Sequence, residues 1–137
     1  MDNLLQGIIA AYAHTTDAAA IALRAASPGG MWLNSAPETI TGTYIVIVPL
    51  GSPIEFTMGG TSTSECSIQF TISSPNNMGE SSTAKAALIS LYQDKELTMT
   101  ARKVIYARQT DDGNPMRDPD SGGYSINLGF RYILGNK

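Results

Sequence analysis

Four aspartates and one arginine lie within residues 110–124, near the end of a chain that carries little charge elsewhere. Alternating carboxylates can bind calcium, and Asp118 and Asp120 would occupy the first and third positions of a calcium loop. The fifth and twelfth positions are Gly122 and Gly129, where such a loop needs an oxygen ligand and a glutamate. The residues therefore predict a turn-rich connection of glycine, proline and aspartate, and no metal site.

The chain contains one histidine, His14, and one cysteine, Cys66. His14 follows an apolar helical stretch, which predicts a role at the end of that helix or in packing. Cys66 falls on the same face of an alternating strand as Ile68 and Phe70, where a cysteine is a small apolar filler and a poor nucleophile. The motifs GxSxG, HExxH and CxxC do not occur in the sequence. We therefore predict no enzymatic activity, no cofactor and no bound metal.

Hydrophobic residues make up 42% of the 137 residues and charged residues 15%, and a charged share of about a quarter is usual. A surface so poor in charge is predicted to be partly covered by partners. The net charge is −3, and lysines and arginines do not cluster, so direct binding of nucleic acid is not expected. A single cysteine and the lack of a basic leader predict folding in a reducing cytoplasm. The longest apolar run, residues 44–50, is too short to span a membrane.

Helical periodicity predicts three helices that could position the candidate residues described above. Apolar residues at i, i+4 and i+8 predict a helix at residues 4–12, and an alanine-rich stretch predicts a second helix at 17–26. A third helix is predicted to begin at Ser81 or Ser82, with Glu80 on a solvated edge.

The remaining segments show the two-residue period of strands. Residues 44–48 are apolar on both faces, which predicts a central strand that is covered on each side. Alternation at residues 54–58 and 66–72 predicts an antiparallel hairpin with one solvated face. Two long strands are predicted at residues 97–107 and 124–134.

The apolar phase of the strand at residues 97–107 slips by one residue, which predicts a β-bulge near Arg102. The elements alternate in no βαβ order and form no internal repeat. They predict an α+β fold: an antiparallel sheet of about four to five strands, two to three helices packed on one face, and a long hairpin loop between the last two strands.

That loop, residues 110–124, is longer than the connection requires, since a two-residue turn can join antiparallel strands. Its length predicts a use, and we expect it to project toward a neighbouring subunit or a tube. Arg108 or Arg117 would then pair with a carboxylate across the contact. The aspartates would shape the turn or face a channel; they are Asp111, Asp112, Asp118 and Asp120.

Several stretches together resemble the tail terminator or tail completion proteins of long-tailed bacteriophages. They are the helix at residues 4–12, MWLNSAPE at 31–38 leading into TYIVIV at 43–48, CSIQFTISS at 66–74, the helix that follows, and the closing strand pair with its loop. The resemblance covers nearly the whole chain. It implies a single tail-terminator-like domain over residues 1–137.

Membership of that family implies a structural virion protein of the tail or neck, assembled in the host cytoplasm. Such a protein forms a homo-oligomeric ring, a hexamer, that caps the head-proximal end of the tail tube, ends tube polymerisation and joins the tail to the neck. Its partners would be further copies of itself, the tube protein and neck or stopper proteins. The acidic net charge fits a lumen through which DNA passes without specific binding.

Two other classes remain open on the sequence alone. Another neck component, such as a stopper or connector, or a tube subunit would also be small and non-enzymatic, although a tube subunit is expected to consist mostly of strands. A small-ligand-binding α+β domain or a hydrolase is the alternative outside virion proteins. A ligand binder would stay a monomer or dimer and would ignore tail tubes, so its mass in solution separates it from a ring protein.

Overall fold

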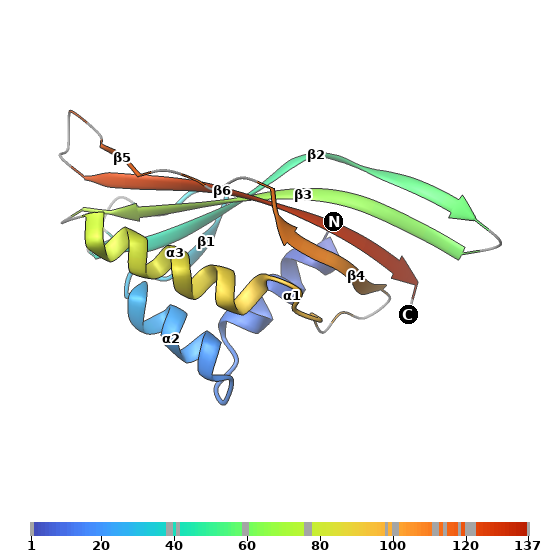
Figure 1. Cartoon of the computed structure of the whole chain (residues 1–137), viewed down its shortest axis with the longest axis horizontal. Helices are drawn as coiled ribbons and strands as arrows, with labels where there is room; N and C mark the ends of the chain where they lie inside the picture. The colour runs from blue at the N-terminus through green and yellow to red at the C-terminus, as the bar shows by residue number, and fades with distance from the viewer. Residues whose placement is uncertain are drawn as a thin grey trace.

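The computed structural model describes residues 2–37, 40, 42–58, 61–75, 78–97, 99, 102–110, 113, 115–117, 119 and 123–136. Helices and strands follow one another along the chain in the order drawn in Figure 1. They are α1 (Asp2–Tyr12), α2 (Ala18–Ala26), β1 (Met31–Leu33), β2 (Tyr44–Met58), β3 (Thr61–Ser74), α3 (Met78–Tyr92), β4 (Arg102–Gln109), β5 (Met116–Arg117) and β6 (Tyr124–Asn136).

Within the described residues, six strands form one sheet in the order β1-β2-β3-β6-β4, and β5 pairs with β6. The short β1 runs parallel to β2, and the other pairings are antiparallel. All three helices lie on one face of this sheet (Figure 1). The predicted α+β class is therefore confirmed. The sheet has more than the expected strands because β1 and β5 are too short to show a period.

The core lies between the helices and the covered face of the sheet. Even-numbered residues of β3 and β6 point into it, from Cys66 to Ile72 and from Ile126 to Leu134, and all are buried. Phe70 stacks on Tyr92 of α3 with ring centroids 5.1 Å apart, and the edge of Phe130 meets Phe70 at 5.4 Å. Each fully buried side chain of this size stabilises the fold by about 2 to 3 kcal/mol through its lost contact with water.

The prediction that residues 44–48 form the central strand is wrong. These residues belong to β2, which lies next to the short edge strand β1, and β3 is the middle strand. Only Ile45 and Ile47 are buried, whereas Val46 and Val48 are partly exposed on the face that no helix covers. β2 also continues to Met58, so the predicted strand at 54–58 is its second half, paired with β3 as expected.

The boundaries before β4 and at the start of α3 also differ from the sequence prediction. Leu97 and Met99 are buried outside any strand, because β4 begins only at Arg102. The predicted bulge exists, but it lies between Val104 and Tyr106. α3 begins at Met78, so Ser81 lies inside the helix and is fully buried.

Candidate assembly interface

The sheet face opposite the helices is open and is lined by side chains that bond to one another. Near its middle, the Thr71 hydroxyl donates to Asn127 Oδ1 at 2.9 Å, and the Gln69 amide donates to both of these residues. Toward the end of β6, Arg131 Nε donates to Glu65 Oε1 at 2.6 Å, and its guanidinium lies 5.8 Å from the centre of the Tyr106 ring. These contacts hold the side chains of the open face in place, and they do not form a recognised catalytic arrangement.

Glu65 also raises the pKa of Arg131 above its ordinary value, first by accepting its hydrogen bond and then by its charge. The two side chains are 42% and 28% exposed. A pair this open to solvent contributes little to stability and is screened by salt. The pair fixes the position of a charged group on the open face of the sheet.

Exposed apolar side chains lie at both edges of the sheet. On β1, Trp32 and Leu33 are 38% and 43% exposed, and on β4, Ile105 and Tyr106 are 54% and 38% exposed. Open strand edges with apolar side chains favour pairing with other chains unless something covers them. Both edges are therefore candidates for contact with neighbouring subunits.

The predicted interface loop is partly visible in the structure. Arg108 forms a bidentate contact with Asp94 of its own chain, with N–O distances of 3.1 and 3.0 Å, and both side chains are exposed. Arg117 lies in β5 and is exposed, with no polar partner among the described residues. The four aspartates of the prediction, Asp111, Asp112, Asp118 and Asp120, lie outside the described residues.

Two contacts anchor the loop to the body of the protein. The Lys85 ammonium of α3 donates to the carbonyl of Gly113 at 3.0 Å. Gly113 lies so close to the backbone carbonyl of Asn127 that a Cβ atom at this position would collide with it. Glycine is required here by close approach. β5 then pairs with β6 through Met116 and Arg117, so this part of the connection is held in place.

A groove of about 530 Å³ lies between the end of α2, the start of β2 and the first turn of α3. Ala25, Ala26 and Pro28 form its apolar wall. The Glu80 carboxylate also lines the groove and accepts hydrogen bonds from the hydroxyls of Thr43 and Ser74, which are both buried.

Glu80 therefore does not lie on the solvated helix edge that the sequence predicted. The earlier start of α3 places it in the first turn, beside residues distant in the chain. An acidic residue in the first turn of a helix is a recognisable sequence signal, but it could be recognised at Glu80 only if the start of the helix had been predicted correctly.

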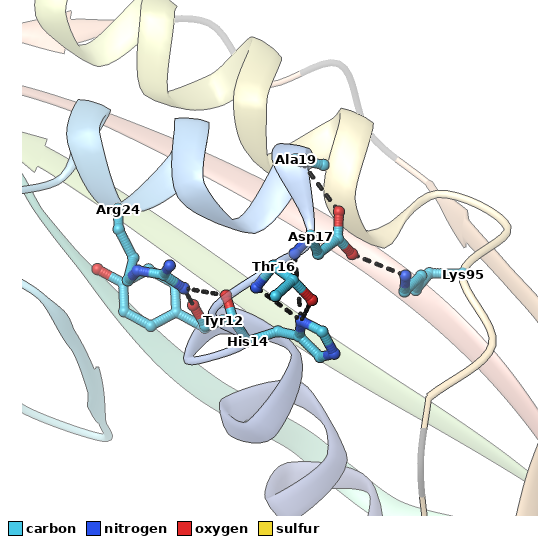
Figure 2. Close-up of polar contacts among 7 residues, drawn as sticks. All are labelled: Tyr12, His14, Thr16, Asp17, Ala19, Arg24 and Lys95. Carbon is cyan, nitrogen blue, oxygen red and sulfur yellow. Dashed lines mark hydrogen bonds and ion pairs between the residues drawn. The ribbon is translucent and has the colours of Figure 1, made fainter.

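Figure 2 shows the polar contacts that join α1, α2 and the segment after α3. Asp17 caps α2 by accepting from the Ala19 N–H at 3.0 Å, and its second oxygen accepts from the Lys95 ammonium at 2.9 Å. The hydrogen bond from Lys95 is the main reason why the pKa of Asp17 is below its ordinary value. Arg24 donates to the carbonyls of Tyr12 and His14, so α2 is tied to the end of α1.

His14 lies just past the end of α1, as predicted. Its Nδ1 accepts from the backbone N–H groups of Thr16 and Asp17 at 3.3 and 3.2 Å (Figure 2). These bonds hold the turn between α1 and α2, and the residue is exposed. Cys66 is 2% exposed on the covered face of β3, as its spacing predicted. The two residues thus have local structural roles.

In the part of the chain that the structure describes, no cluster of three metal-binding side chains occurs. The helices among these residues are also too short or too polar to cross a membrane.

No protein-family model matches the chain, and no curated protein matches it. Among solved structures, it is similar to a chain from the virion of a native gene transfer agent (GTA) particle, with a TM-score of 0.69. The match covers 88% of this chain and 87% of the virion chain at 15% sequence identity. At that identity the comparison shows a shared fold over nearly the whole length of both chains.

Proposed function

We propose that the protein is a structural subunit of a phage-like virion, forming a ring that caps the head-proximal end of the tail tube and joins it to the neck. The observation that carries this proposal is the whole-chain similarity to a GTA virion chain. A match over 87% of the other chain means that the two proteins share the full architecture and not a common hairpin or helix pair.

The surface of the molecule supports an assembly role. Ile105 and Met116 expose more than half of their side chains at 54% and 55%, and both belong to strands on the same side of β6. Such positions are costly in an isolated subunit and useful in an assembled one. The tail-terminator role itself rests on the sequence resemblance. The same resemblance is the basis for proposing one domain over the whole chain, six copies per ring, location in the virion and assembly in the host cytoplasm.

In this proposal the ring contacts further copies of the chain, the tube protein and neck or stopper proteins, and DNA passes through without specific binding. The function needs neither catalysis nor a cofactor. A stopper or connector is the nearest alternative, because the shared fold does not distinguish positions along the neck. A ligand-binding domain has weaker support, since the groove beside Glu80 is wide open and the whole-chain similarity is to a virion chain.

The test is to delete the gene from a particle-producing strain and to measure tail-tube length by electron microscopy. We expect tubes of uncontrolled length that do not join heads, because nothing ends their polymerisation. Expression of the protein in trans should restore the length, and a tagged copy should appear as several symmetry-related densities at the upper end of the tube. Tubes of normal length without heads would indicate a stopper, and normal particles would refute a role in assembly.

A further inference from the structure

β5 presents two exposed side chains on an anchored support. Met116 is 55% exposed, and Arg117 is exposed and has no polar partner among the described residues. Backbone pairing with Ser125 and Tyr124 of β6 fixes this short strand. A side chain displayed on ordered backbone loses little entropy when it binds. Met116 and Arg117 therefore have the properties of an interface projection, an apolar anchor beside a cation.

The groove beside Glu80 has the complementary chemistry. Its wall of Ala25, Ala26 and Pro28 offers apolar surface for a methionine or for the aliphatic part of an arginine. Glu80 supplies a carboxylate whose position is fixed by the hydroxyls of Thr43 and Ser74. A carboxylate can accept up to about four hydrogen bonds, so Glu80 can accept one from a guanidinium while Oε2 keeps those from Thr43 and Ser74.

The projection and the groove lie toward opposite edges of the sheet but at the same end of the molecule. β5 is hydrogen-bonded to the side of β6 that faces away from β3, whereas the groove includes Thr43, just before β2. The two are thus separated by roughly three strand spacings, about 14 Å across the sheet. In Figure 1 both β5 and the start of α3 lie at the left end.

We propose that β5 of one copy inserts into the groove of the next, with Arg117 pairing with Glu80 and Met116 packing on the alanine and proline wall. Because the two patches differ, this contact is heterologous and generates a ring or an open helix. This inference rests on the proposed function, since it supplies the subunit contact of the proposed ring.

The first test is a charge exchange measured by sedimentation velocity on the purified full chain. Arg117→Glu should weaken self-association about tenfold or more, the effect of losing one partner of a desolvated charge pair. Glu80→Arg should do the same, and the double variant should recover much of the association. Thr15→Glu is the control for added negative charge, because Thr15 is also exposed but lies in the turn between α1 and α2, away from both patches and from the sheet edges. Equal weakening by Arg117→Glu and Thr15→Glu would refute the contact.

Glu80 also bonds within its own subunit, so a second test avoids changing it. Pro115→Cys, which keeps Met116 and Arg117, and Thr83→Cys are purified separately, then mixed and oxidised; Pro115 precedes β5 and is exposed, and Thr83 lines the groove and is exposed. We expect a cross-linked dimer in the mixture and none in either variant alone. The native Cys66 is buried and does not compete. A wild-type chain that associates while the mixture gives no cross-link overturns the proposal, as does a wild-type chain that stays monomeric.

The outcomes separate this contact from the function that it serves. If Arg117→Glu caps tubes and forms rings like the wild type, the contact is wrong and the tail-terminator function stands. If the cross-link forms but particles lacking the protein have normal tails, the contact stands and the function is wrong.

Discussion

The hydroxyl of Tyr92 donates a hydrogen bond of 2.7 Å to the backbone carbonyl of Ile8, so the last turn of α3 is fastened to the middle of α1. Both residues are fully buried. Burial raises the pKa of Tyr92 well above its ordinary value, because the charged form would lose its hydration. The phenol therefore stays protonated and acts as a donor throughout the physiological pH range.

Replacing Tyr92 by phenylalanine should lower the free energy of unfolding by about 1 kcal/mol. The ring and its stacking on Phe70 remain, and only the hydrogen bond to Ile8 is lost. Urea denaturation followed by circular dichroism measures this difference. A variant as stable as the wild type would show that water or a neighbouring group replaces the lost donor.

Tyr132 provides the opposite case. Its hydroxyl is buried and has no hydrogen-bond partner among the described residues. Burial also raises the pKa of this phenol. Because the hydroxyl gains no bond on folding, Tyr132→Phe should leave stability unchanged or raise it by up to about 1 kcal/mol. The same denaturation experiment checks this, and a clear loss of stability would reveal a bound water or partner at this position.

Acidification should remove the contribution of Asp17. Lys95 lowers the pKa of this carboxyl below its ordinary value of 3.8 in the folded state. The folded protein therefore holds the proton less tightly than the unfolded chain, so the stabilisation is complete well above pH 3.8 and disappears as the pH falls through the lowered pKa. Asp17→Asn keeps a capping oxygen but removes the charge. Its melting temperature should be lower than that of the wild type at pH 7, and the difference should shrink in acid.

Much of the fold follows from sequence periodicity, and the errors have physical causes. Apolar and polar residues alternate regularly along β3 and β6 because the helices cover only one face of these strands. The buried face of each strand could therefore be predicted. Residues 44–48 were misplaced because the open face of β2 also carries valines. This composition predicts burial, although in the isolated chain those side chains are partly exposed. If a partner covers that face in the assembly, the valines are buried there, and the sequence pattern reflects the assembled state and not the isolated subunit.

The candidate interface was predictable only in part. The loop composition predicted a contact through Arg108 or Arg117, and no local pattern showed that Arg108 pairs with Asp94, which lies 14 residues from it in the sequence. The groove beside Glu80 brings together residues from three elements, and no local pattern encodes such a meeting. Glu80 and Thr43 are separated by 37 residues.

Neither His14 nor Cys66 is expected to carry chemistry. His14→Gln removes the local hydrogen bonds that Nδ1 accepts within an exposed turn, and Cys66→Ala removes one buried sulfur at a cost of about 1 kcal/mol. Particles that carry either change should assemble and infect normally. Infectivity that fails while fold and assembly are retained would show that one of these residues has a chemical role.

The loop gives the most direct test of the assembly hypothesis. Replacing residues 112–120 by Asn-Gly removes β5 and the anchor at Gly113, but it leaves β4 and β6 to pair as before. The core lies between the helices and the covered face of the sheet and includes neither Met116 nor Arg117, which are both exposed. The isolated subunit should therefore unfold at nearly the wild-type temperature, while self-association and tail joining are lost. A glycine-serine segment of equal length is the control: it restores the span of the loop without its side chains and should also fail to assemble. Normal tails from the shortened protein would show that the loop is only a connection.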